Sequence, residues 1–201
     1  YRAGDGVHRL NVLRRYGEEK RWMFNPWHWY APRLERKCLE SAQVIVANSN
    51  LVKDLICSEY PYLGHKTKTI YNGFDPSVYC LPNKSKEELR RQLGLPEHGT
   101  QLLLSGHGFA RKGLHHAVSV LSELVVRRKK SVHLVVAGKG DKDLVKRQVE
   151  SSDLSDRVHF VGVVDGIEKY YQSADFMILP TRHDPFSNSC LEALACGCPV
   201  I

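Results

Sequence analysis

Two segments of the sequence combine glycines or a helix start with charged side chains, and both could bind a phosphorylated ligand. The first, Gly-His-Gly-Phe-Ala-Arg-Lys-Gly at residues 106–113, follows the apolar run Leu102–Ser105. Glycines let a backbone approach a ligand closely, and Arg111 and Lys112 supply two cations at a helix start. Such cations would neutralise the charge that develops on a diphosphate leaving group. An ordinary strand-to-helix turn with solvent-exposed cations fits the same letters equally well.

The second segment, residues 180–197, follows the apolar run 176–179 and contains a predicted helix. The spacing of Leu191, Leu194 and Ala195 predicts that helix, and Gly197 ends it. Its first turn offers backbone N–H groups near residues 188–190, which can bind phosphate. Glu192 could contact a ligand too. However, Ser189 stands three residues before it, and this capping-box spacing favours a purely structural role for the carboxylate.

The elements that must position these segments alternate between short apolar runs and amphipathic windows. Strands are predicted at 43–47, 68–71, 102–105, 132–137, 158–161 and 176–179, with helices near 51–56, 85–93, 114–125, 141–151 and 167–174. This alternation predicts an α/β fold with doubly wound parallel sheets and helices on both faces. In such sheets ligands bind at the carboxyl ends of the strands, where both segments begin.

The net charge of +7 is concentrated in the first third of the chain. Residues 1–70 contain 12 Lys and Arg against 7 Asp and Glu, beside the aromatic cluster Trp27-His28-Trp29-Tyr30. This combination suits an anionic membrane surface or a phosphorylated acceptor, and an ordinary solvated surface fits equally well. Nucleic acid binding is not favoured, because no stretch concentrates the charge in a known reading motif. No apolar run approaches the ~18–20 residues that span a bilayer.

The six cysteines form no CxxC pair and no disulfide framework, which indicates reduced thiols in a cytosolic protein. The chain begins at Tyr1 and ends on the apolar Pro199-Val200-Ile201, which predicts the start of a buried strand. We therefore expect a piece of a longer protein that lacks both ends.

Several segments together resemble one enzyme family. Asp184-x7-Glu192, followed by Ala-Leu-Ala-Cys-Gly, resembles the E-x7-E signature of family 4 retaining glycosyltransferases, and residues 108–113 resemble its diphosphate clamp. Segments 47–49, 71–75 and 158–162 follow in the family's usual order. Residues 2–8 are similar to the acceptor-side loop of the branch that glucosylates the lipopolysaccharide inner core. The resemblance spans essentially the whole chain and implies a GT-B fold of two Rossmann-like domains.

The resemblance also implies roles for individual residues. Arg111 and Lys112 would bind the donor diphosphate, and Glu192 would hold the ribose hydroxyls. Asp184 would stand near the transferred sugar, while Asp5 and His8 would face the acceptor from the other domain. Further donor contacts would come from the strand end with Val161 and Val164 (base), from the amides of Phe186 and Ser187 (sugar), and from the helix start at Asn188, Ser189 and Cys190 (phosphate).

By the same resemblance, residues 1–74 would end the acceptor domain and 101–201 would begin the donor domain. The polar stretch 75–100, which contains three prolines, is predicted to form an interdomain linker region. The resemblance implies transfer of a hexose, with glucose expected, from a UDP-linked donor to a glycan or glycolipid, without a metal cofactor, at the inner face of the cytoplasmic membrane. Asp141-Lys142-Asp143 matches a DxD motif but opens a predicted helix. Asp184 replaces the family's usual Glu and is one methylene shorter, which leaves the choice of donor open.

Two alternatives make different predictions. A sugar-nucleotide epimerase on the same fold would turn over the nucleotide sugar without an acceptor. A non-catalytic module that binds nucleotide or anionic lipid through the basic first third would keep its affinity in Glu192→Ala and lose it in salt.

Overall fold

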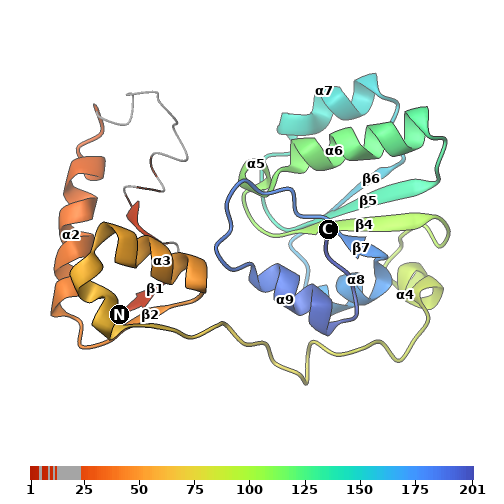
Figure 1. Ribbon diagram of the computed structural model, residues 1–201. Helices are drawn as coiled ribbons and strands as arrows, with labels where there is room; N and C mark the ends of the chain where they lie inside the picture. Colours follow the sequence, from red (N-terminus) through yellow and green to blue (C-terminus); the bar gives the residue numbers. More distant parts are fainter. Residues whose placement is uncertain (5, 9, 11, 13–23) are drawn as a thin grey trace. The chain divides into compact units, whose positions relative to one another are not determined.

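The computed structural model describes residues 1–4, 6–8, 10, 12 and 24–201. These residues form two compact units (Figure 1). The first comprises residues 1–73 with 184–186, and the second comprises 74–183 with 187–201. Each unit is built around its own parallel sheet.

The first unit has a three-stranded parallel sheet in the order β1-β2-β3. Its strands are β1 (Arg2–Ala3), β2 (Ile45–Ala47) and β3 (Thr67–Thr69). The helices are α2 (Trp27–Ser41), α3 (Asn50–Glu59) and the 3-10 helix η2 (Pro61–Lys66). Ser49 caps α3 by accepting a hydrogen bond from the Val52 N–H at 3.2 Å. The core of this unit consists of small and branched apolar side chains: Ala3, Val7, Leu39, Ile45, Ala47, Val52, Ile56 and Leu63.

The second unit has a four-stranded, all-parallel sheet in the order β6-β5-β4-β7. Its strands are β4 (Thr100–Ser105), β5 (Val132–Ala137), β6 (Val158–Gly162) and β7 (Phe176–Met177). Next to β7, Met177 forms a parallel bridge with Val200. Residues 199–201 were predicted to start a buried strand, but Ile201 is 63% exposed. The helices are α4 (Lys86–Gln92), α5 (Phe109–Lys112), α6 (Leu114–Ser122), the π-helical turn η3 (Glu123–Arg127), α7 (Asp143–Ser151), α8 (Ile167–Ser173) and α9 (Asn188–Ala195).

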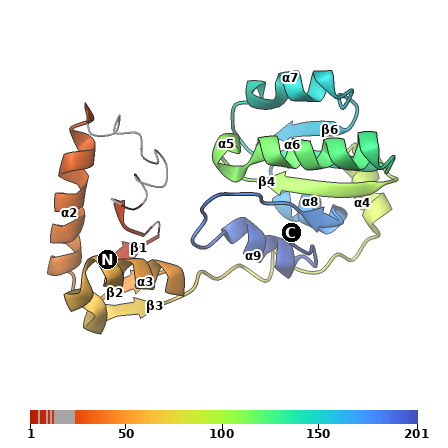
Figure 2. The same ribbon diagram turned by 45° about the horizontal axis from the view of Figure 1, so that its top comes forward.

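Alternate residues of the central strands of the second unit enter different cores. Leu102 and Leu104 pack with α6 and α7 on one face, whereas Leu103 packs with α8 and α9 on the other. Figure 1 and Figure 2 show these helix pairs on opposite sides of the sheet. Because helices cover both faces, most residues of these strands are apolar, as expected for a parallel sheet, and Gln101 and His133 are buried polar exceptions. The predicted doubly wound α/β fold is confirmed.

The whole stretch 75–100, predicted as an interdomain linker region, groups with the second unit. Helix α4 starts after Ser85, whose hydroxyl accepts the Glu88 N–H, and Arg90 on this helix is only 3% exposed. Its guanidinium donates to the carbonyls of Ser173, Glu97 and Gly99 and pairs with Asp175 at 2.8 Å. A buried guanidinium is retained only where its donors are satisfied, so these contacts fix α4 against the sheet. The sequence prediction had no means to identify these distant acceptors.

Candidate functional site

The loop after β4 turns tightly because of its glycines. Helix α5 is a single turn between Gly108 and Gly113, and both glycines adopt left-handed backbone conformations, with φ of 76° and 77°. A Cβ added to Gly113 would lie 2.1 Å from the Pro180 carbonyl oxygen. Only glycine therefore fits at position 113, and the loop after β4 lies directly against the loop after β7.

The two cations of this loop differ in their surroundings. Arg111 is exposed, whereas Lys112 is only 6% exposed. The Lys112 side chain crosses Gly106, where a Cβ would meet Cε of Lys112 at 3.0 Å and Nζ at 3.7 Å. A turn with two solvent-exposed cations, which the letters also allowed, is therefore wrong for Lys112. Lysine is seldom buried so fully, and its ammonium lies at the carboxyl end of β4.

The loop after β7 is tied to this cationic turn by a hydrogen bond. The Thr181 hydroxyl donates to the Arg111 carbonyl at 2.9 Å, with a longer 3.3 Å contact to the His183 carbonyl. Strands β4 and β7 are parallel neighbours, so the residues that follow them emerge at the same edge of the sheet. The structure thus brings the cationic turn and the start of the second predicted segment, residues 180–183, together within the second unit.

Helix α9 begins at Asn188, with Ser187 as its N-cap residue. The backbone N–H groups of Asn188, Ser189 and Cys190 in its first turn precede the first N–H that donates within the helix, which is that of Leu191 to the Ser187 carbonyl at 3.3 Å. N–H groups at this position of a helix can bind an anion. The Ser187 and Ser189 hydroxyls lie 2.9 Å apart. The helix start therefore offers amide and hydroxyl groups at the position where the sequence predicted a phosphate contact.

The capping-box interpretation of Glu192 is wrong. Because the N-cap is Ser187, Ser189 lies inside the helix, and the Glu192 carboxylate turns to another partner. The Tyr171 hydroxyl, from α8, donates to Glu192 Oε2 at 3.1 Å and lies 2.9 Å from the Ser105 hydroxyl at the end of β4. The Tyr79 phenol also interacts with Glu192. The carboxylate is thus held by two phenols near the carboxyl end of β4.

The electrostatic surroundings of Glu192 are mixed. Burial raises the pKa of the carboxyl group, and the hydrogen bonds from Tyr171 and Tyr79 lower it. Burial raises the pKa of Tyr171 far above its ordinary value, so the phenol stays protonated and acts as the donor. Sequence reasoning missed Ser105, Tyr79 and Tyr171, because their neighbours in sequence carry no sign of a shared partner.

The predicted base-lining residues lie at the carboxyl end of β6. Val161 and Val164 are half-buried and pack against the core on the α8 and α9 face, whereas Val163 between them is 68% exposed. The Gly162 carbonyl accepts the Gly138 N–H at 2.6 Å, which joins this strand end to that of β5. That these residues line the base of a nucleotide stays a prediction.

The predicted acceptor-side residues belong to the first unit. The His8 N–H donates to Glu35 at 2.8 Å, and its ring nitrogen Nε2 lies 3.1 Å from Nδ1 of His28. Burial and the neighbouring His28 lower the pKa of His8, so its ring is held neutral. Asp184 and Phe186, which were expected to lie near the donor sugar, are half-buried and also group with the first unit. Asp5 lies outside the described residues.

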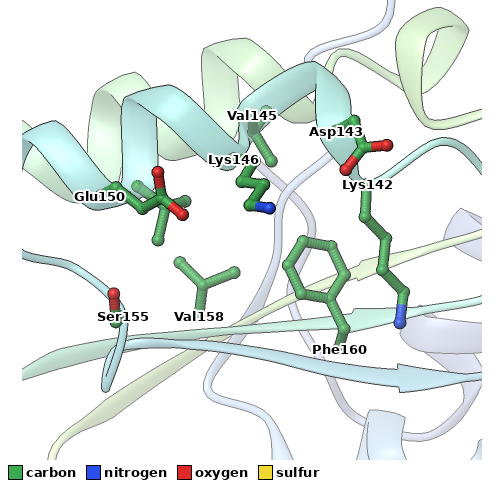
Figure 3. A pocket seen from close by; sticks show the side chains of 9 residues that line it. Lys142, Asp143, Val145, Lys146, Glu150, Ser155, Val158 and Phe160 are labelled. Carbon is green, nitrogen blue, oxygen red and sulfur yellow. The ribbon is translucent and has the colours of Figure 1, made fainter.

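A separate hollow of about 400 Å³ lies between α7 and β6 (Figure 3). Val145 from α7 and Val158 and Phe160 from β6 line it with apolar groups, and the Lys142 ammonium lies 5.2 Å from the centre of the Phe160 ring. The nine side chains that line this hollow do not include Arg111, Lys112 or Glu192. It is therefore distinct from the edge at which the predicted donor residues lie.

Within the described ranges, no three His, Cys, Asp or Glu side chains are grouped so that they could hold a metal ion. None of the helices in the described part of the chain has the length and hydropathy to cross a membrane.

Comparisons with known proteins agree with this geometry. The chain is 33% identical over 168 residues to an uncharacterized glycosyltransferase of Methanocaldococcus jannaschii, with 81% of this chain and 42% of that protein covered. It is 33% identical over 175 residues to the alpha-monoglucosyldiacylglycerol synthase of Streptococcus pneumoniae, with 84% and 39% covered. The chain thus spans less than half the length of these two relatives.

Solved structures show the same fold. WaaG, a glycosyltransferase involved in lipopolysaccharide biosynthesis, matches with a TM-score of 0.85 at 23% identity, over 100% of this chain and 55% of that one. Anabaena HepE in complex with UDP and glucose matches with a TM-score of 0.73 at 25% identity, over 84% and 46%. The expected GT-B architecture is confirmed.

The match to known families divides along the chain. Residues 7–78 match Glycosyltransferase Family 4, and residues 85–201, more than half of the chain, match Glycosyl transferases group 1. The second match contains the cationic loop after β4, Glu192 and the start of α9. This chain therefore belongs to the group 1 glycosyl transferases.

Proposed function

We propose that the protein transfers a hexose, with glucose expected, from a UDP-linked donor to a glycan or glycolipid acceptor, with retention of the anomeric configuration. One observation carries the proposal. The buried Lys112 and the Glu192 carboxylate follow neighbouring strands of the second unit, at the edge where nucleotides bind in such sheets. A nucleotide sugar needs both groups, because its diphosphate is anionic and its ribose presents a vicinal diol.

In this proposal the diphosphate is the leaving group. Arg111, Lys112 and the N-terminus of α9 stabilise the charge that grows on its bridging oxygen as the bond to the sugar breaks. The acceptor oxygen attacks the anomeric carbon from the same face and passes its proton to the departing phosphate, which balances the step. Glu192 holds the ribose, and Asp184 stands near the transferred sugar with the amides of Phe186 and Ser187. Asp5 and His8 face the acceptor.

The choice of UDP-glucose draws support from HepE, whose solved complexes contain UDP, glucose and UDP-glucose. The choice of a lipopolysaccharide inner core as acceptor draws on the resemblance of residues 2–8 to that branch. We further propose that no metal ion takes part, since Arg111, Lys112 and the α9 amides supply the positive charge. Chelation with EDTA should then leave turnover unchanged.

A thermal-shift titration of the full-length protein tests the donor site. UDP, UDP-glucose, ADP-glucose and GDP-mannose are compared on the wild type, on Glu192→Ala and on the double variant Arg111→Ala with Lys112→Ala. A ligand at ~100 times its dissociation constant stabilises by ~2.7 kcal/mol. We expect stabilisation by the uridine ligands alone, and its loss in both variants.

Arg127→Ala with Arg128→Ala is the matched control, because it also removes two cations of the second unit. These two arginines pair with Glu123 after α6, so the control should respond to UDP like the wild type. Equal responses of all variants would remove the physical basis of the proposal. Turnover of UDP-glucose without an acceptor would instead favour the epimerase.

We also propose that the protein contacts the anionic inner face of the cytoplasmic membrane through α2. Trp27, Trp29 and Tyr30 are each more than half exposed on its first turn, and Arg33, Arg36 and Lys37 are exposed further along it. Exposed aromatic rings beside cations suit the interface of an anionic bilayer. Flotation with vesicles that contain phosphatidylglycerol should recover the protein. Trp27→Ala with Trp29→Ala should weaken the recovery, and purely zwitterionic vesicles should give none.

A further inference from the structure

We propose that Tyr171, itself held by Ser105, is a positioning residue that aims the Glu192 carboxylate at the ribose diol of the nucleotide. The inference rests on the proposed function, since it assumes that Glu192 binds the ribose. It adds two residues, Tyr171 and Ser105, to which neither the resemblance nor the matched families assign a role.

The three side chains form a short chain of hydrogen bonds between different elements. Ser105 ends β4, Tyr171 lies on α8 and Glu192 lies on α9, with separations of 2.9 Å between the two hydroxyls and 3.1 Å from Tyr171 to Glu192 Oε2. Ser105 and Tyr171 are buried, at 3% and 1% exposure, and Glu192 is half-buried. The chain therefore runs from the sheet core to the ligand edge.

The direction of these hydrogen bonds is fixed by the carboxylate. An ionised carboxylate can only accept, so the Tyr171 hydroxyl must donate to Glu192 and accept from Ser105. Each bond polarises the next, which strengthens the hold on the carboxylate. Because an ionised carboxylate has about four acceptor sites, capacity remains for the two hydroxyls of a ribose.

The benefit of this arrangement is preorganisation. A glutamate side chain loses rotational freedom when it binds a ligand, and a side chain already ordered pays that cost during folding instead. The Tyr79 ring, centred 6.5 Å from that of Tyr171, flanks the pair, and its phenol also interacts with Glu192. Tyr171 differs from Tyr79 in being wholly buried, so its role is to orient rather than to contact the nucleotide.

A cycle of variants and ligands tests the inference on the full-length protein. Calorimetry measures the affinity of UDP and of its 2′,3′-dideoxy analogue, which lacks the diol, for the wild type, Tyr171→Phe, Ser105→Ala and Glu192→Gln. Tyr170→Phe is the matched control, because it removes a phenol from the neighbouring position of α8. Ser105→Ala provides a second reading should Tyr171→Phe fail to fold, as judged by its thermal transition.

We expect Tyr171→Phe to weaken UDP binding about tenfold, equivalent to ~1.4 kcal/mol, and to change binding of the dideoxy analogue less than about twofold. Ser105→Ala should give a smaller loss of the same selectivity, and Tyr170→Phe none. One outcome would overturn this inference alone. In it, Glu192→Gln weakens UDP binding more than binding of the dideoxy analogue, but Tyr171→Phe weakens the two equally or not at all. If Glu192→Gln weakens binding of UDP and of the dideoxy analogue equally, the ribose contact is overturned, and the inference with it.

Discussion

Replacing Gly113 by alanine separates two costs that the structure assigns to the turn between β4 and α6. The first is conformational, because the backbone at position 113 has a φ of 77°. The second is steric, because the new Cβ would lie 2.1 Å from the Pro180 carbonyl oxygen. Gly108 has nearly the same φ, 76°, but a Cβ there would meet nothing within 4 Å. Gly108→Ala is therefore the control that carries only the first cost.

The magnitudes follow from these geometries. A left-handed conformation costs an alanine about 1–2 kcal/mol, which is the whole loss expected for Gly108→Ala. In Gly113→Ala the carbonyl must also retreat from 2.1 Å to at least 3.0 Å. Crowding of this kind in a packed region costs about 1–3 kcal/mol more. We expect a total loss of about 2–5 kcal/mol for Gly113→Ala.

Urea unfolding followed by far-ultraviolet circular dichroism measures both variants. A shifted midpoint with an unchanged slope reports stability rather than a change in the unfolded chain. The reasoning fails if the two alanine variants lose the same free energy, because the loop after β4 would then not touch the loop after β7. A crystal structure of Gly113→Ala should show the Thr181 to Arg111 hydrogen bond broken or lengthened.

Two further predictions concern buried polar groups. Asp175→Asn should lower the unfolding free energy, measured in urea, by about 3 kcal/mol, because it leaves the buried Arg90 without its counter-charge. Burial opposes ionisation of Asp175, but the Gln101 N–H, Lys86 and Arg90 prevail and lower its pKa. Its stabilisation is thus present above the unfolded pKa near 3.8 and lost as the pH falls through the folded value, a loss absent in Asp175→Asn. Burial, His159 and Arg157 lower the pKa of His133 to about 4. Stability should therefore fall from pH 6.5 towards 4, and His133→Gln should flatten that slope in urea titrations at each pH.

Helices and strands whose apolar pattern lies within their own sequence, such as β5 and α6, could be predicted. Every residue of the run 132–137 except His133 is apolar. The run forms β5 at those bounds, because both faces of the sheet are covered. The helical spacing of Leu114, Ala117, Val118 and Leu121 predicted α6, and these four side chains are buried in the structure. Arg127 and Arg128, which follow this helix, pair with Glu123.

The site was predicted less completely, because its contacts are distant in sequence. Ser189 and Glu192 have the spacing of a capping box, but the helix starts after Ser187. The Glu192 carboxylate instead accepts a hydrogen bond from the Tyr171 phenol, 21 residues away. The burial of Lys112 could not be predicted from the sequence, because it depends on the packing of its side chain against Gly106. Ser105 and Tyr171, 66 residues apart, meet because α8 packs against the end of β4.

The position of β4 and β5 inside the sheet of the second unit gives their amides a particular meaning for hydrogen exchange. Both strands have a neighbour on each side and a helix layer on each face. Their N–H groups can reach solvent only when the whole unit opens, so the slowest exchange in the chain should occur there. Amides of β1, β2 and β3 report on the other unit. Exchange therefore separates the stability of the two units within one sample, which a single melting curve combines.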